Sequence, residues 1–395
     1  MNEYESIRPY GDGEVIEAMA RVAKHRMIPI ISKYLFPKAM PGYLARKLKD
    51  VRGVDDFQNR VMVEVVTSVI ARTSEGFTVS GAENLKKVSG KFLAVSNHRD
   101  IVLDPALIQF AIRNEGLPCT ELCVGDNLLS TTMIEDLMRS NKMIKVLRGL
   151  KPREMYSSSK ILSKYIRESI TSNESSVWIA QREGRTKNGL DATEQGLLKM
   201  FDLSGQGEFA DNFAELNIIP MSISYEYESC DAKKARELLI KKQNGGKYVK
   251  KPKEDTHSIL TGIRQRKGHI HLSIGAPVTL DELHAAQAEG KSANEHYQAL
   301  CKLMDRRIIG GYRLFKTNYM GYDLMNGTKE YLGVEYLPHD LEEFVAYTEH
   351  KLGKLERNLD RSELHKIFWG IYGNPVVSMK NLINNISASR PSDMP

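Results

Sequence analysis

The sequence predicts an α/β protein with a mixed, largely parallel sheet flanked by helices, an N-terminal amphipathic helical segment and a C-terminal helical appendage. In the middle of the 395-residue chain, short apolar runs alternate with segments of helical periodicity, and this alternation is typical of strands joined by helical crossovers. Helical patterns dominate before residue 76 and after about residue 285. We therefore expect an N-terminal helical segment at residues 1–75, an α/β domain at residues 76–285 and a mostly helical extension at residues 286–395.

The composition is that of a folded globular chain. Hydrophobic residues make up 41% of the sequence and charged residues 27%, values that exclude collagen, a coiled coil or wholesale disorder. The longest strongly apolar stretch, Ile101–Ile112, contains Asp104 and is shorter than the roughly 20 residues that a spanning helix needs. Because the N-terminus lacks a basic segment followed by an apolar one, we expect no secretory leader and a cytoplasmic protein.

Short apolar runs predict the strands, and the segments between them predict helices. The strands are expected at Phe92–Val95, Glu121–Val124, Met143–Leu147, Val177–Gln181, Ile218–Ser224 and His269–Ile274. The intervening helices are expected at Pro105–Asn114, Met133–Ser140, Met155–Thr171 and Glu194–Phe201. Further on, we expect a helix N-cap at Asp281, helices at Asn294–Ile309 and Leu341–Leu359, a break at Gly373-Asn374-Pro375 and a frayed tail at Ser387–Pro395.

Two basic regions suggest contact with an anionic partner. In Val15–Leu35, apolar residues recur at helical spacing with cations between them, and Pro29 should break or kink this helix. The apolar face of the segment either packs on the core or rests on anionic lipid. The run Lys233–Lys253 contains Glu237 as its only acid, and either receives a carrier protein or the membrane surface or forms a solvated loop. With no recognisable module around it, this run does not predict nucleic-acid binding.

A histidine directly follows the first buried strand. His98 stands at the carboxyl end of that strand, with Asp100 and Asp104 two and six residues later. Ligand crevices of open α/β sheets form at this edge. A carboxylate beside the histidine would fix its tautomer, so that the other ring nitrogen can accept a proton from a hydroxyl group. The pattern predicts a general base.

Cations and glycines follow two other strands at the same expected edge. The turn Glu183–Gly189 comes directly after the strand at Val177–Gln181, and the strand at Met143–Leu147 leads into Arg148-Gly149. The planar fork of an arginine suits phosphate. These turns therefore predict a phosphate site, although each alone also fits a solvated turn.

Taken together and in this order, the segments resemble the glycerolipid acyltransferase family. Asn97-His98 with Asp104-Pro105 looks like the first block of the family, Lys145–Gly149 followed by Met155-Tyr156 like the second, Glu183-Gly184 with Arg185 like the third, and Ile218–Tyr225 like the fourth. His271–Val278 resembles the strand that commonly follows. The resemblance spans about residues 78–280.

Two positions depart from the family pattern. The family has an aspartate five positions after the histidine, where this chain has Leu103. We favour Asp104 as the partner of His98 because Pro105 follows it, as in the family pattern, whereas Asp100 stays an alternative because residues two apart on an extended segment point to the same side. The third block reads Glu-Gly-Arg-Thr instead of Glu-Gly-Thr-Arg, which leaves open whether Arg185 or Lys187 contacts phosphate.

The resemblance implies an acyltransferase of phospholipid synthesis that acts at the inner face of the membrane. His98 would deprotonate a glycerol hydroxyl that attacks the thioester of acyl-CoA or of an acyl-carrier protein, without an acyl-enzyme, a metal or a cofactor. The expected acceptor is 1-acyl-sn-glycerol 3-phosphate, with glycerol 3-phosphate as the alternative. Beside His98 and its aspartate, the implied residues are Arg148, Arg185 and Lys187 for the phosphate, Glu183 and Gly184 for the floor of its site, and Asn97 and Pro220 as supporting residues.

Three other functions compete with this interpretation. His98-Arg99-Asp100 also begins the catalytic loop of protein kinases, but no Asp-Phe-Gly follows it and no glycine-rich loop precedes it. A zinc hydrolase would have to use His98, His269 and His271. His269 and His271 alternate on one strand face, but a pair of this kind is a weak metal signal without a third ligand at a matching spacing. A non-enzymatic lipid-binding protein on the same fold is the stronger rival, and it would tolerate replacement of His98.

Overall fold

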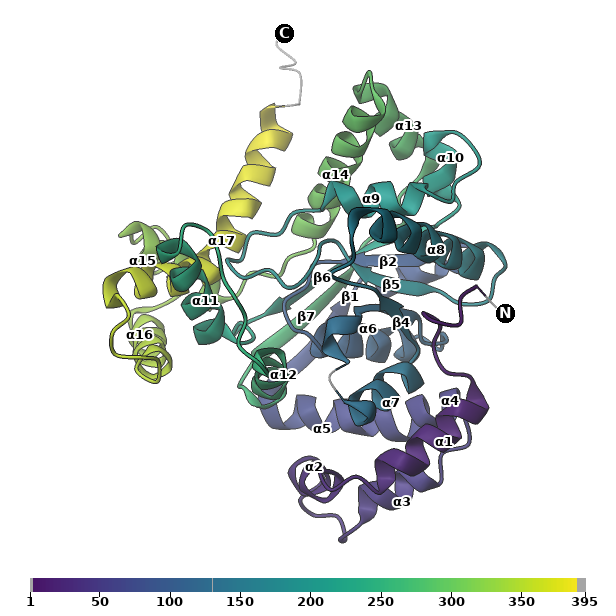
Figure 1. Ribbon diagram of the computed structural model, residues 1–395. Coiled ribbons are helices and arrows are strands. Elements are labelled where there is room, and N and C mark those ends of the chain that lie inside the picture. The colour runs from purple at the N-terminus through teal and green to yellow at the C-terminus, as the bar shows by residue number, and fades with distance from the viewer. Residues whose placement is uncertain (1–2, 130, 389–395) are drawn as a thin grey trace.

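The computed structural model describes residues 3–129 and 131–388 and contains a seven-stranded sheet (Figure 1). The predicted tail from residue 389 onward lies outside the described residues. The strands are β1 Ser74–Ser80, β2 Leu93–Ser96, β3 Glu121–Gly125, β4 Met143–Val146, β5 Val177–Ala180, β6 Ile218–Tyr225 and β7 Gly268–Ile274. All six predicted strands are present within a residue or two. The sequence analysis missed β1, an edge strand whose residues are all at least partly exposed and which therefore lacks an apolar run.

The strands are ordered β1-β7-β6-β2-β5-β3-β4. All neighbouring strands pair in parallel except β6 and β7, which are antiparallel. The predicted mixed, largely parallel sheet is thus confirmed. The carboxyl ends of β2 to β6 meet at one edge of the sheet, where the loops that follow them can build a site.

Alternating residues of the central strands are buried against helices on opposite faces of the sheet. Leu93 and Val95 pack against α8, α9 and α14, whereas Ala94 packs against α5 and α6. Both faces are covered, which explains why the central strands are apolar on both sides. The helices between and after the strands are α6 Leu103–Asn114, α7 Thr132–Ser140, α8 Pro152–Thr171, α9 Gln195–Asp202, α10 Phe209–Ala214, α11 Asp231–Gln243, α12 Glu254–Arg264, α13 Leu280–Glu289 and α14 Ala293–Gly310.

The N-terminal helices form a cluster beside α7 (Figure 1). Their apolar residues, such as Val15 and Met19 of α1 and Leu48 of α3, share one buried core. Pro29 lies in the first turn of α2, so the predicted helical run is divided before it. The elements are α1 Asp12–Ala23, α2 Ile28–Leu35, α3 Tyr43–Lys49, α4 Val54–Asp56, a π-helical turn Phe57–Met62 and α5 Val63–Thr73.

The C-terminal helices divide between two cores. α14 packs on the central sheet, where Leu300 and Met304 are fully buried. α15 Lys316–Asn326, α16 Pro338–Leu352 and α17 Arg361–Ala388 instead pack with α11 in a separate core. The basic run at 233–253 therefore begins on a packed helix and not in a solvated loop, and Lys234 is buried against Glu228.

Three boundaries in the C-terminal part were predicted wrongly. α17 continues through residues 373–375, because Gly373 lies against the backbone of Tyr322 in α15, where a side chain would not fit, and this contact holds the helix across Pro375. Thr279, and not Asp281, caps α13 by exchanging hydrogen bonds with Glu282. The helix expected at 341–359 starts at residue 338 and ends at residue 352.

None of the helices in residues 3–129 and 131–388 combines the length and the apolarity that crossing a bilayer requires.

Candidate active site

His98 lies just beyond β2, where the chain leaves the sheet. The side chain of Asn97 continues the pairing with β6: its Oδ1 accepts from the Ile223 amide at 2.8 Å and its Nδ2 donates to the Ile223 carbonyl at 3.0 Å. The side-chain amide of Asn97 thus takes the place of a backbone partner for β6, and it fixes the position of the chain directly before His98. The His98 ring lies edge-on to Trp178, with 13% of its side chain exposed.

Asp104 is the carboxylate that contacts His98. Its Oδ2 is 2.8 Å from His98 Nδ1 and also accepts from the backbone amides of Arg99 at 2.5 Å and Asp100 at 2.8 Å. Its Oδ1 accepts from the Tyr225 hydroxyl at 2.7 Å, and burial raises the pKa of Tyr225 well above its usual value, so this hydroxyl stays a donor. Both oxygens of this fully buried carboxylate thus accept hydrogen bonds, three at Oδ2 and one at Oδ1.

This arrangement fixes the tautomer of His98. A carboxylate beside Nδ1 requires a proton on that nitrogen, which leaves Nε2 as the acceptor in the neutral ring. Within the described residues, Nε2 has no protein partner. The ring is therefore oriented as a base at the solvent side of the sheet edge.

Asp100, the alternative partner, has another role. Its Oδ1 accepts from the amides of Val102 at 2.9 Å and Leu103 at 2.8 Å at the start of α6, and its Oδ2 accepts from the Ser229 hydroxyl. Gly262 lies so close to this carboxylate that a Cβ would be 2.1 Å from Oδ2. Asp100 thus shapes the turn and points away from His98, and the extra residue relative to the family pattern is accommodated in this turn.

The predicted cations gather next to His98. The amide of Thr186 donates to the His98 carbonyl at 2.9 Å, which places Arg185 and Lys187 beside the histidine. Lys187 pairs with Glu237 at 2.6 Å, and Arg148 Nη1 lies 2.8 Å from Glu183 Oε2. Burial lowers the pKa of Lys187, and the neighbouring Arg185 charge lowers it further.

Arg185 differs from the other two cations because, in the described residues, it forms no ion pair with a carboxylate. The residue is 8% exposed, and its buried Nη1 has no hydrogen-bond partner in the described structure. Burial of a guanidinium nitrogen without a hydrogen-bond partner costs free energy. Gly184, which adopts the left-handed conformation with a φ of 69°, turns the chain directly before it. The arrangement is suited to an anion that arrives with a ligand.

A second network, which the sequence analysis missed, holds the loop after His98. Arg99 Nη2 donates to Asp191 at 2.6 Å, and Asp191 also accepts from the Tyr312 hydroxyl. Lys234 Nζ donates to the Arg99 carbonyl at 3.0 Å and to Glu228 at 2.6 Å. These residues lie far apart in the sequence and form no motif, so no local pattern indicated them.

Other predicted residues are not brought to this edge. Pro220 pairs with Val95 inside the sheet, and its carbonyl accepts from the Gly275 amide at 2.8 Å, so its role is confined to the sheet. Both ring nitrogens of His271 contact hydroxyl groups, at 2.8 Å to Thr78 and 2.9 Å to Ser80.

The zinc hypothesis requires histidines that the structure keeps apart. In the described residues, the ligand atoms of His269 lie within 4.8 Å of those of Glu75 and Glu226, a group that includes neither His98 nor His271. The geometry therefore does not assemble the site which that hypothesis needs.

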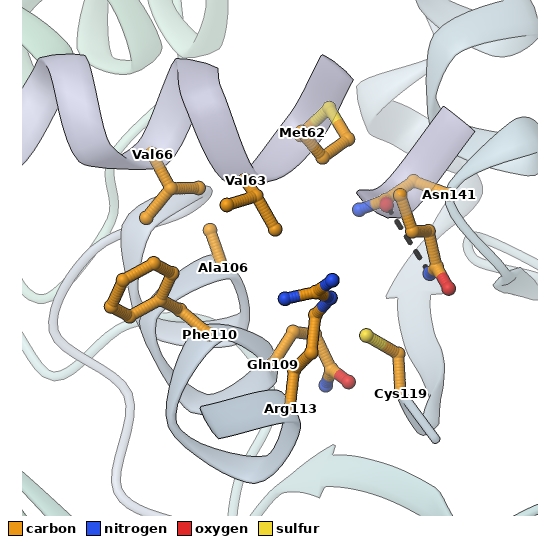
Figure 2. A pocket seen from close by; sticks show the side chains of 10 residues that line it. Met62, Val63, Val66, Ala106, Gln109, Phe110, Arg113, Cys119 and Asn141 are labelled. Atoms are coloured by element: carbon orange, nitrogen blue, oxygen red, sulfur yellow. Dashed lines mark hydrogen bonds between the residues drawn. The ribbon is translucent and has the colours of Figure 1, made fainter. Parts of the chain in front are cut away.

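A small hollow lies between α5 and α6 (Figure 2). Met62, Val63 and Val66 face Ala106 and Phe110 across it, and Gln58 and Asn141 close one side with a 3.4 Å hydrogen bond. Its volume of about 30 Å³ has room for one or two water molecules. We therefore regard it as a packing defect next to the π-helical turn and not as a site for an acyl chain.

Comparisons with known proteins agree with the motif analysis. Residues 76–224 match the family model described as Acyltransferase. No curated protein matches the chain. Among solved structures, the chain is similar to the crystal structure of the 1-acyl-sn-glycerophosphate (LPA) acyltransferase PlsC from Thermotoga maritima, with 12% identity and a TM-score of 0.36 over 75% of this chain and 93% of that one.

The matched segment contains the candidate base, its carboxylate and the candidate phosphate ligands. It includes His98 and Asp104 from the first block, Arg148 from the second, and Arg185 and Lys187 from the third. Residues 76–224 are therefore similar to the Acyltransferase family, and the part of the chain that is matched carries the candidate base and cations.

Proposed function

We propose that the protein transfers a fatty acyl group from a thioester donor to the free hydroxyl of 1-acyl-sn-glycerol 3-phosphate. The observation that carries this proposal is the pairing of His98 with Asp104 beside the buried, unpartnered Arg185. The first feature supports removal of a proton from a hydroxyl group, and the second supports an acceptor that carries a phosphate. The match of residues 76–224 to the Acyltransferase family model supports acyl transfer as the reaction.

In the proposed reaction, His98 acts as a general base. Its Nε2 takes the proton of the acceptor hydroxyl while the oxygen attacks the thioester carbonyl, and Asp104 stabilises the imidazolium that forms. When the tetrahedral intermediate collapses, the carbon–sulfur bond breaks and the thiolate takes the proton back from His98. The products are an ester and a free thiol, with no acyl-enzyme.

The acceptor phosphate would lie against Arg185. Lys187 is two residues from Arg185, and Arg148 contacts Glu183 in the same turn, so both could contribute, but each now pairs with a carboxylate. A phosphate could displace Glu183 from Arg148 more easily than Glu237 from Lys187, because 67% of the Glu183 side chain is exposed against 16% for Glu237. We therefore expect Arg185 and Arg148 to be the main phosphate ligands.

A lipid acceptor also requires contact with a membrane, and α2 offers the surface for it. Ile30 is 55% exposed and Met40, in the turn after α2, is 75% exposed, and Lys33 and Lys38 are exposed between them. Apolar and basic side chains in this arrangement are typical of peripheral contact with anionic lipid. We therefore propose a peripheral protein at the inner face of the membrane.

Acyl transfer from labelled acyl-CoA and acyl-carrier protein to both candidate acceptors tests the proposal. We expect transfer to 1-acyl-sn-glycerol 3-phosphate, and a loss of about 10²-fold to 10⁴-fold in His98→Ala at unchanged folding, as measured by circular dichroism. A preference for glycerol 3-phosphate would support the alternative acceptor. Activity that survives in His98→Ala would refute the proposed base, and a wild type without transfer would favour the lipid-binding function.

A further inference from the structure

A larger hollow lies at the far end of α11, where this helix meets the loop to α12. Its volume is about 340 Å³, which is in the range of small-molecule sites. One wall is the last two turns of the helix and the other is the loop. The lining residues are Arg236, Ile240, Asn244, Lys247, Tyr248, Val249 and Lys251.

The side chains in this hollow combine free positive charge with a fixed aromatic ring. Lys247 and Lys251 are exposed and have no ion-pair partner among the described residues. The Tyr248 hydroxyl donates to Glu254 at 2.8 Å and accepts from Arg236 Nη1 at 3.4 Å, which holds the ring in place.

The positive charge of Arg236 is already balanced. Its Nε lies 2.8 Å from Glu356 Oε1, and hydrogen bonding to Arg236 lowers the pKa of Glu356 to about 2, so this carboxylate stays ionised. The charges that remain available for a ligand are therefore those of the two lysines. Ammonium groups beside an aromatic face and the Asn244 amide match a base that carries phosphates.

The same helix connects this hollow to His98. Lys234, on the first turn of α11, contacts the carbonyl of Arg99, the residue after the histidine. Asn244 follows ten positions later, which at 1.5 Å per residue corresponds to about 15 Å along the helix. A pantetheine arm has about thirteen bonds between its sulfur and its phosphate, and at roughly 3.5 Å per three bonds of an extended chain it reaches about 15 Å.

We propose that this hollow binds the nucleotide end of acyl-CoA while the thioester lies at His98. The inference rests on the proposed acyl transfer and adds to it the identity of the donor. A carrier protein or a membrane would need a broad convex surface of lysines, whereas the free lysines here line a concave site with an aromatic ring. The site binds the adenine and its phosphates and leaves the pantetheine to run along α11.

The double variant Lys247→Gln/Lys251→Gln tests the site, with Lys241→Gln/Lys253→Gln, two exposed lysines without an ion pair among the described residues, as the matched control. The control removes the same charge from the same basic run but outside the hollow. We expect the KM for acyl-CoA to rise about tenfold or more in the first variant, because two charge-assisted contacts are lost, with kcat nearly unchanged. The KM for acyl-pantetheine, which lacks the nucleotide, should not change in either variant.

An unchanged KM for acyl-CoA would overturn the proposal, and so would a rise that is confined to acyl-carrier protein. Binding of adenosine 3′,5′-bisphosphate, measured by titration calorimetry, tests the site independently of acyl transfer. If the wild type transfers no acyl group from any donor, the proposed function fails, but weaker binding of this nucleotide to the Lys247→Gln/Lys251→Gln variant would still support the site. Equal binding to all three proteins would refute it.

Discussion

The two halves of the candidate site differ in how far their polar groups are satisfied. Around His98, both oxygens of the buried carboxylate of Asp104 have hydrogen-bond donors, four in all. Beside it in the fold, Arg185 is 8% exposed, and its buried Nη1 has no hydrogen-bond partner among the described residues. A base has to be oriented before its substrate arrives, whereas an anion site can leave its cation for the substrate to neutralise. Substitutions in the two halves should therefore change stability in opposite directions.

The largest effect is expected for Asp104→Asn. An amide in this position presents its NH₂ group to donors and cannot stabilise an imidazolium, so kcat should fall by about 10²-fold or more. Because buried donors lose their acceptor, the free energy of unfolding should also fall, by about 1–3 kcal/mol. Acyl-transfer kinetics and urea unfolding measure the two changes.

Asp100→Asn is the matched control for this substitution. The amide oxygen still accepts from the turn at the start of α6, and the residue does not contact His98. We expect a moderate loss of stability with kcat nearly unchanged. If Asp100→Asn instead lost as much activity as Asp104→Asn, the assignment of the carboxylate would be wrong.

The second effect concerns the other half of the site. Arg185→Gln should raise the KM for the phosphate-bearing acceptor by about tenfold to 100-fold, since a charge-assisted contact is lost. The same change removes a desolvated, unpaired charge, so the free energy of unfolding should rise or stay unchanged. Steady-state kinetics with varied acceptor and thermal unfolding test both parts.

Arg167 provides the comparison for Arg185. It is equally buried, but its guanidinium donates to the carbonyls of Asn212 and Phe201, both at 2.7 Å, and to Ser204 at 2.9 Å. Arg167→Gln should therefore lower stability and leave the KM unchanged. A loss of stability in both variants would contradict the proposal that Arg185 stays unpaired until an anion binds.

The two halves also differ in how well the sequence predicted them. The general position of His98 and of the cations followed from strand ends, because parallel strands bring their carboxyl ends to one edge. The choice between Asp104 and Asp100 could not be made, since it depends on how the turn before α6 accommodates one residue. The carboxylates that pair with the cations could not be predicted either, because Glu237 lies on α11, fifty residues after Lys187.

The fold shows the same limit. Apolar runs indicated the six strands that lie inside the sheet or have buried faces, but not the half-exposed β1. Local sequence patterns predicted helix ends wrongly where tertiary contacts determine them. Gly373 and Pro375 predicted a helix break, yet packing against α15 keeps α17 continuous. Tyr225, visible in the sequence only as the end of an apolar run, gains its role from facing Asp104.

A smaller effect is expected for Tyr225→Phe. The substitution removes one of the four donors to Asp104 and keeps the ring in its buried site. We expect kcat to fall by about threefold to tenfold and the free energy of unfolding by about 1 kcal/mol, with the KM for both substrates unchanged. A rise in KM without a loss of kcat would mean that Tyr225 contacts substrate and does not position the carboxylate.

The smallest effect is a shift in melting temperature on addition of an anion. A ligand at about three times its Kd stabilises the native state by about 0.8 kcal/mol, which for a chain of this size corresponds to about 1–2 °C. Glycerol 3-phosphate should thus raise the melting temperature of the wild type and of His98→Ala alike, because neither lacks Arg185, but not that of Arg185→Gln. Sodium chloride at the same ionic strength controls for screening. A shift in melting temperature that persists in Arg185→Gln would mean that the anion binds elsewhere. If the shift is lost in Arg185→Gln but kept in His98→Ala, phosphate binding and proton transfer depend on different residues at the same edge of the sheet.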